Sequence, residues 1–116
     1  MRFLLFVIPP LLALGVGGPA LGQTAAQDVG LTEEFLGDPA QIAAGEKVWG
    51  KRCKFCHGKT AYPGKAPKLQ PANLAPEFIF DRVTNGFRGM PSFRQEFSEE
   101  ERKAVVAFIK SGRFSN

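Results

Sequence analysis

One short segment, Cys53-Lys54-Phe55-Cys56-His57, restricts this chain more than any other feature of its sequence. It contains both cysteines of the chain and its only histidine. Two intervening residues allow one turn of backbone to present both sulfur atoms on the same side, with the histidine next to them. Cys-x-x-Cys-His is the pattern through which c-type haem is attached. The segment therefore predicts thioether bonds from both cysteines and an iron ligand in His57.

Other interpretations of the two cysteines explain fewer residues. A thioredoxin-like redox pair has the same spacing but follows a strand, whereas the residues before Cys53 have helical character. A structural zinc site needs four protein ligands, and after the leader the chain offers three of the usual nitrogen or sulfur kind. A plain disulfide would leave His57 without a role. Haem attachment is the main prediction, with a redox pair or a disulfide as the alternatives.

Met90 is the expected second iron ligand. The only other methionine is Met1, which lies in the leader described below. A thioether paired with an imidazole is a ligand set of electron-transfer haem. Met90 stands between a glycine and a proline, in a turn that is poorly suited to ordinary core packing, which is the alternative role. We therefore expect His57 and Met90 to bind one haem iron.

Residues 1–22 are predicted to form a secretory signal peptide. A positively charged start precedes an apolar run, and a small-residue cleavage site ends at Gly22. The run contains two prolines and is short for a membrane-spanning helix, so an uncleaved anchor is the weaker alternative. Export fits haem attachment, which takes place outside the cytoplasm. We expect a periplasmic protein without stable membrane insertion after cleavage.

The remaining chain has the length of one small domain. Residues 23–37 are expected to form an N-terminal arm, which Leu31, Phe35 and Leu36 could hold to the body. Residues 38–116 are expected to form the domain itself. A domain of this size is small for a self-sufficient apolar core, and a bound haem would supply a large rigid apolar body.

Three main helices are predicted. The first begins at Asp38, a good N-cap followed by proline, and runs into the cysteine segment. The second extends over residues 76–85, and the third begins at Ser98, where Glu101 completes a capping-box pattern. Loops rich in glycine and proline connect the helices. No segment shows the alternation of a strand, which predicts an all-α fold.

Basic residues gather around the cysteine segment. Residues 46–68 hold seven bases and one acid, whereas residues 23–45 hold four acids and no base. These bases could steer the protein to an acidic surface on a redox partner; a solvated face that only maintains solubility is the alternative. Nucleic acid is not expected as a partner, because the bases lack interleaved exposed aromatics. The seven bases, called the basic collar below, are Lys47, Lys51, Arg52, Lys54, Lys59, Lys65 and Lys68.

Over residues 38–112 the chain resembles class I cytochrome c, the family of small monohaem cytochromes. Gly45 and Trp49, at four-residue spacing before Cys53, are similar to the family's Gly-x-x-x-aromatic pattern. In the family these two positions cross the C-terminal helix at close range. The partners that the resemblance implies on that helix are Val105, Phe108 and Ile109.

Residues 66–69 (Ala-Pro-Lys-Leu) are similar to the family's Gly-Pro-x-Leu loop, with alanine in place of glycine. The resemblance implies that the Pro67 carbonyl accepts a hydrogen bond from His57 and that Leu69 packs on the haem. Residues 63–64 (Pro-Gly) are a competing candidate for this loop. Met90 and the proline after it resemble the family's Met-Pro axial loop.

The resemblance implies a cytochrome c fold, with three main helices and loops wrapped around one covalently attached haem c. We expect a monomeric electron carrier and not an enzyme. It would pass single electrons from a donor dehydrogenase or quinol-oxidising complex to a terminal oxidase or reductase. The alternative is a dedicated haem c subunit of one periplasmic oxidoreductase complex, docked through the acidic arm. The predicted cofactor-binding residues are Cys53, Cys56, His57, Pro67, Leu69 and Met90, of which His57 and Met90 bind the metal.

A gas-sensing or peroxidatic haem is disfavoured. Such a haem needs an open or easily opened iron site, which Met90 would close. The chain also has no second histidine for acid-base chemistry.

Overall fold

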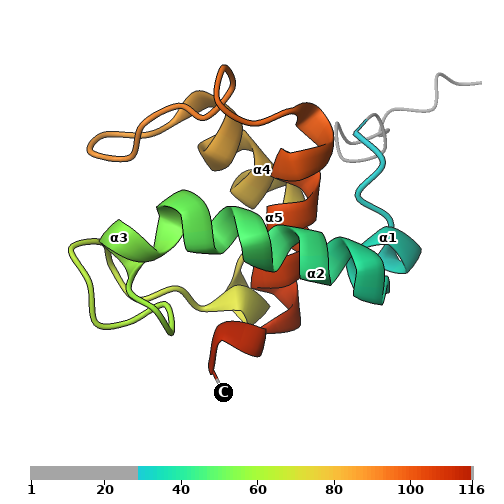
Figure 1. The fold of residues 1–116 in the computed structure, drawn as a ribbon, viewed down its shortest axis with the longest axis horizontal. Helices are drawn as coiled ribbons and strands as arrows, with labels where there is room; N and C mark the ends of the chain where they lie inside the picture. Colours follow the sequence, from blue (N-terminus) through green and yellow to red (C-terminus); the bar gives the residue numbers. More distant parts are fainter. Residues whose placement is uncertain (1–28, 116) are drawn as a thin grey trace, which may run out of the picture.

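The computed structural model describes residues 29–115 (Figure 1). The predicted signal peptide and residues 23–28 of the arm lie outside the described residues. Within 29–115 the chain is helical and has no strand, which confirms the all-α prediction. The one β-bridge found there joins Phe87 and Met90.

Helices of different length alternate with loops along this part of the chain. Their bounds are α1 Glu33–Gly37, α2 Pro39–Val48, η1 Trp49–Cys53, α3 Lys54–His57, η2 Pro71–Asn73, α4 Pro76–Asn85, α5 Glu99–Ser111 and η3 Arg113–Ser115. The first of the three predicted main helices is α2, η1 and α3 joined end to end, with η1 as a π-helical segment, and the other two are α4 and α5. None of the helices described here is long and apolar enough to span a membrane.

Local capping residues explain where α2 and α5 begin. The Asp38 carboxylate accepts a hydrogen bond from the Ala40 N–H at 2.8 Å. Before α5, the Ser98 hydroxyl accepts from the Glu101 N–H at 3.2 Å, and the Glu101 carboxylate accepts from the Ser98 N–H at 3.0 Å. This is the complete capping box predicted from the sequence. The caps satisfy N–H groups that the first turn of a helix leaves without partners.

The core is built where α2 crosses α5 (Figure 1). Val105 and Val106 of α5 are completely buried. Gly45 lies at the crossing: a Cβ atom added there would lie 2.7 Å from Cβ of Phe108 and would overlap the backbone carbonyl of Ala104. Only a residue without a side chain allows this approach, which confirms the predicted crossing and explains a glycine in mid-helix.

Trp49 extends the same contact towards the cysteine segment. Its ring is buried and lies 5.9 Å from the ring of Phe108 and 5.2 Å from that of Phe114, measured between centroids. The Trp49 ring also lies 5.7 Å from the ring of His57, measured between centroids. The core therefore supports the histidine directly.

The described part of the N-terminal arm packs on the body through α1, which contacts α5. Leu31 and Leu36 are buried in the core, and Phe35 is partly buried against it. The Nζ of Lys103 on α5 lies 5.6 Å from the centre of the Phe35 ring. Leu31, Phe35 and Leu36 are the three apolar residues that were expected to hold the arm to the body. The boundary between arm and domain at residue 38 stays a prediction.

Candidate functional site

A large cavity lies between the α3 end of the first main helix and the loops on either side of α4. Its volume is about 1140 Å³, slightly above the roughly 300–1,000 Å³ of ordinary small-molecule sites. The lining residues come from the end of the first main helix, the loop that follows α3, α4, and the loop between α4 and α5, which is orange in Figure 1. All six site residues predicted from the sequence line this cavity: Cys53, Cys56, His57, Pro67, Leu69 and Met90.

Cys53 and Cys56 occupy consecutive turns at the end of the first main helix. Cys53 is buried, Cys56 is exposed, and the two thiols are not joined in a disulfide. Burial raises the pKa of the Cys53 thiol to about 12, so this thiol is protonated near neutral pH. No group of three or more His, Cys, Asp or Glu side chains suited to a metal ion occurs in the described chain. Because Cys53 and Cys56 both lie near the end of the same helical stretch and both line the cavity, the helix brings the two sulfur atoms to one site.

His57 is the last residue of α3 and is half-buried. Burial lowers the pKa of its imidazole, which favours the neutral form that binds metals. Its Nδ1 is buried and has no hydrogen-bond partner within residues 29–115. The bond to the Pro67 carbonyl that the resemblance implied is therefore not formed, and this expectation is wrong for the structure.

The loop after α3 instead contacts the cysteine segment through its backbone. The Ala66 N–H donates a hydrogen bond to the Cys56 carbonyl at 2.9 Å. Gly64 packs so closely that a Cβ atom there would lie 2.7 Å from the carbonyl carbon of His57. Gly64 belongs to segment 63–64, the competing candidate for the family's Gly-Pro-x-Leu loop. The close backbone contact with His57 is therefore made by that segment. Pro67 follows at the cavity wall but is exposed.

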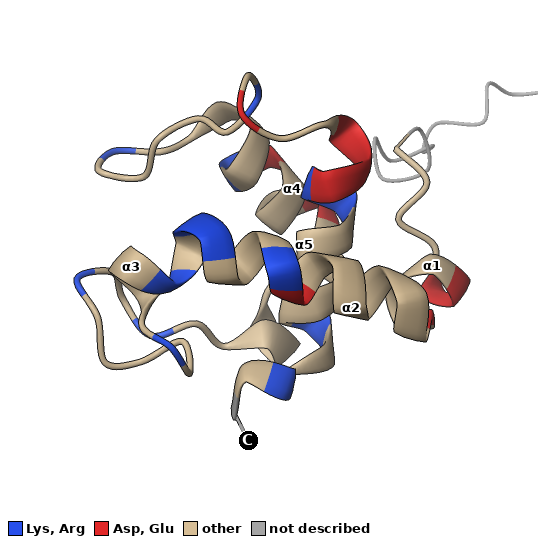
Figure 2. Cartoon of the chain, viewed as in Figure 1, with Lys and Arg blue, Asp and Glu red and all other residues tan. Residues whose placement is uncertain are grey.

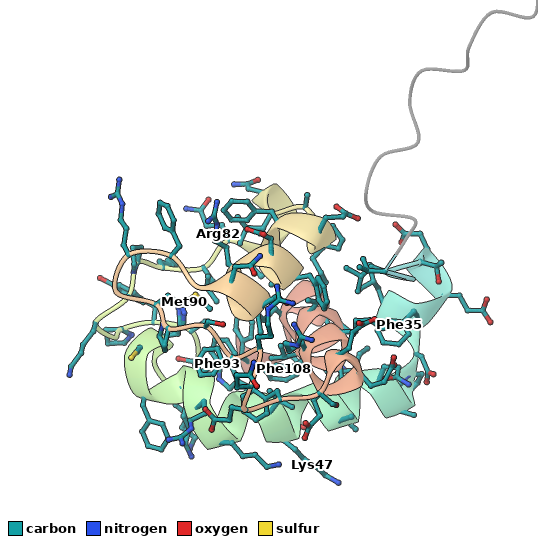
Figure 3. All side chains as sticks on the ribbon, turned by 90° about the horizontal axis from the view of Figure 1, so that it is seen from above. Phe35, Lys47, Arg82, Met90, Phe93 and Phe108 are labelled. Atoms are coloured by element: carbon teal, nitrogen blue, oxygen red, sulfur yellow. The ribbon has the colours of Figure 1, made fainter. Side chains whose placement is uncertain are left out.

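A tight hairpin between α4 and α5 carries Met90. Phe87 and Met90 exchange two backbone hydrogen bonds of 2.9 Å each. Arg88 at the tip has a φ of +53°, which is unfavourable for a residue with a side chain. The backbone pair between Phe87 and Met90 holds Arg88 in this conformation. The hairpin delivers the half-buried Met90 to the cavity wall (Figure 3).

Lys110 fixes a further part of the wall and was not expected to have this role. Its Nζ, on α5, donates hydrogen bonds to the carbonyls of Pro71 at 2.7 Å and Leu74 at 2.8 Å. Leu74 lines the cavity together with Asn73. In the sequence Lys110 is an ordinary base in the last turn of a helix, and no local pattern indicates a contact almost forty residues away.

Aromatic residues form much of the cavity rim. Phe55, Phe78 and Phe87 line the cavity, yet they are 67%, 47% and 50% exposed. Phe93 lines it from the interior and is buried. No spacing in the sequence separates these residues from the phenylalanines of the core, so their places follow only from the structure.

The charged residues that line the cavity are mostly basic. The acid among them, Glu96, forms an ion pair with Arg52. Figure 2 shows bases on η1, α3, the following loop and the Met90 hairpin, and acids on α1 and at the start of α5. Only part of the basic collar reaches the cavity. The Nζ of Lys51 instead lies 3.8 Å from a carboxylate oxygen of Glu101. The lining bases are Arg52, Lys65 and Lys68 from the collar, together with Arg82 and Arg88.

Comparisons with known proteins show the family to which the chain belongs. Residues 40–109 match the family model of cytochrome c oxidase, cbb3-type, subunit III. The cytochrome bc1 complex cytochrome c subunit of Corynebacterium diphtheriae is 34% identical over 83 residues, which are 66% of this chain and 29% of that protein. The cytochrome c subunit of 4-cresol dehydrogenase from Pseudomonas putida is 34% identical over 68 residues, 59% of this chain and 58% of that protein. No solved structure matches the chain.

The chain spans about a third of the length of the bc1 subunits and over half of the 4-cresol dehydrogenase subunit. The match to the family model covers more than half of this chain and includes both the cysteine segment and the Met90 hairpin. The chain therefore belongs to the c-type cytochrome domains of the cbb3-type oxidase subunit III family, which bind haem c and carry electrons.

Proposed function

We propose that this chain is a periplasmic carrier of single electrons that holds one haem c. Cys53 and Cys56 would bind the haem covalently, and His57 and Met90 would be the iron ligands. The observation that carries the proposal is that all four side chains line one large cavity. The donor set fits the group, because two thiols one helical turn apart, an imidazole and a thioether are what a covalently attached, six-coordinate haem requires.

Each residue would have a distinct task. The bound haem iron would carry one electron by alternating between its ferric and ferrous states. The Met90 thioether would raise the reduction potential relative to a second nitrogen ligand. His57 and Met90 together would leave oxygen no open coordination site. The Trp49 ring behind His57 and the hydrogen-bonded hairpin of Met90 would limit movement of both ligands.

The cavity rim supports docking to an acidic partner surface. Five bases and one acid line the cavity, and the exposed rings of Phe78 and Phe87 lie at the same rim. An electron must pass close to this opening, and complementary charge raises the rate of encounter between proteins. The chain would act as a monomer that meets a donor dehydrogenase or quinol-oxidising complex and then a terminal oxidase or reductase. Residues 1–22 would direct its export.

The names of the relatives favour a second candidate, a dedicated haem c subunit of one oxidoreductase complex. The Pseudomonas putida relative is such a subunit of 4-cresol dehydrogenase. In this chain α1 carries the exposed Glu33 and Glu34 and lies at the end of the molecule away from Met90 (Figures 1 and 3). It could bind a partner without covering the cavity. Gel filtration of native extract separates the candidates: co-elution with a large dehydrogenase supports the subunit, and elution as a monomer supports the carrier.

Carbon monoxide binding to the ferrous protein tests the ligand assignment. Wild type should not bind it, because His57 and Met90 would already be the ligands of the iron. Met90→Ala should bind it readily and should have a lower reduction potential. Leu74→Ala is the matched control, because it enlarges the same cavity but keeps the thioether, and it should behave as wild type. Equal binding by wild type and Met90→Ala would contradict the assignment of Met90.

A further inference from the structure

Arg82 is a base of the cavity wall with a buried side-chain N–H that has no hydrogen-bond partner among the described residues. It lies in the last turn of α4, lines the cavity and has a side chain 31% exposed. Its Nε is buried and has no hydrogen-bond partner within residues 29–115. Its ion-pair contact is a long one, 3.7 Å from an Nη to the carboxylate of the adjacent Asp81. A buried N–H without an acceptor is unfavourable, so this position favours an acceptor from outside the chain.

Two aromatic rings hold the guanidinium in place. Its central carbon lies 4.8 Å from the centre of the Phe78 ring and 4.3 Å from that of Phe87. Phe78 is one turn earlier on α4, and Phe87 begins the hairpin that carries Met90. Both rings line the same cavity, and Figure 3 places Arg82 beside the Met90 hairpin. The guanidinium is therefore fixed at the junction of α4 and the hairpin before any ligand arrives.

Within residues 29–115 the cavity wall supplies no carboxylate to this guanidinium. Glu96 is the acid among the lining residues, and it is paired with Arg52. The other lining bases, Lys65, Lys68 and Arg88, are exposed and can be hydrated. Arg82 thus differs from them in combining a place in the cavity wall with a buried side-chain N–H that has no acceptor within residues 29–115.

We propose that Arg82 binds a propionate carboxylate of the haem, an inference that rests on the proposed function. A haem carries two propionates, and a planar guanidinium offers parallel N–H donors that match a carboxylate. The pair would neutralise one negative charge close to the iron. It would also link the cofactor, through the ring of Phe87, to the hairpin that holds Met90.

Resonance Raman spectroscopy of the ferric protein tests this pair, because the propionate bending band responds to hydrogen bonding of the carboxylate. Arg82→Gln should shift the band and lower the reduction potential, since a propionate charge would be left uncompensated. Arg82→Lys keeps the charge but not the parallel donors, so it should shift the band while retaining most of the potential. Arg88→Gln, an exposed base of the same wall, should leave the band unchanged.

An unshifted propionate band in Arg82→Gln would overturn the inference and leave the proposed function intact. An equal shift in Arg88→Gln would also overturn it, because the effect would then come from general charge at the rim. If Arg82→Gln does not accumulate with haem, Arg82→Lys decides the question by the same band. Failure of the proposed function itself looks different: wild type would then lack covalent haem.

Discussion

The crossing of α2 and α5 leads to a prediction about Gly45. A methyl group on Gly45 would lie 2.6 Å from the carbonyl carbon of Ala104 and 2.7 Å from Cβ of Phe108. Neither atom is the flexible end of a side chain, so the helices must separate. Overpacking of this kind costs about 1–3 kcal/mol, occasionally more, and we place Gly45→Ala at about 3 kcal/mol because backbone must move.

Helix propensity acts in the opposite direction. Alanine is about 1 kcal/mol more favourable than glycine inside a helix, so the net loss for Gly45→Ala should be about 2 kcal/mol. A domain of this size loses roughly 4–8 °C in Tm for each kcal/mol, which predicts a Tm lowered by about 8–16 °C. Thermal unfolding of the haem-loaded protein, followed by circular dichroism, measures this shift.

Gly50 is the matched control for Gly45. It lies in the same continuous helical stretch, but a Cβ atom added there would meet nothing within 4 Å. Gly50→Ala should therefore leave the Tm unchanged or raise it. If Gly45→Ala were as stable as Gly50→Ala, the two helices would not meet at Gly45 in solution and the reasoning would be refuted.

Two further predictions concern docking and the cavity wall. The rate of reduction by a physiological donor should fall as salt rises, because ions screen charges over about 8–10 Å at ordinary ionic strength. Lys65→Glu and Lys68→Glu at the cavity should slow it in stopped-flow experiments more than Lys103→Glu on α5; a rate independent of salt would assign the bases to solubility. Lys110→Met should lower the free energy of unfolding by about 1.5–3 kcal/mol, since it removes a charged donor from two carbonyls. Chemical denaturation of the haem-loaded variant checks this, and an unchanged midpoint would mean that Lys110 does not hold the wall.

Some features of the site and of the fold could be predicted from the sequence because they are local or sterically unusual. The spacing of Cys53, Cys56 and His57 depends on one turn of chain. A glycine in mid-helix, Gly45, indicated close packing, and the capping box at Ser98 located the start of α5.

Contacts made by the loops around the cavity left no comparable pattern in the sequence. The position of Gly64 against His57 and the reach of Lys110 to η2 depend on how the loops close around the cavity. The five-residue α1, capped by Thr32, is too short for a helical periodicity to be recognised. The predicted hydrogen bond from His57 to Pro67 failed for the same reason, because similarity of a four-residue loop does not determine which of its atoms meet the histidine.

The account's central claim is that Cys53 and Cys56 hold a haem covalently, and mass spectrometry after extraction with acidified acetone tests it most directly. The solvent removes haem that is bound only by coordination. The account predicts that the exported, purified protein stays coloured and has the mass of the polypeptide plus one haem. Haem that moves into the acetone, or a mass equal to that of the polypeptide alone, would contradict the claim.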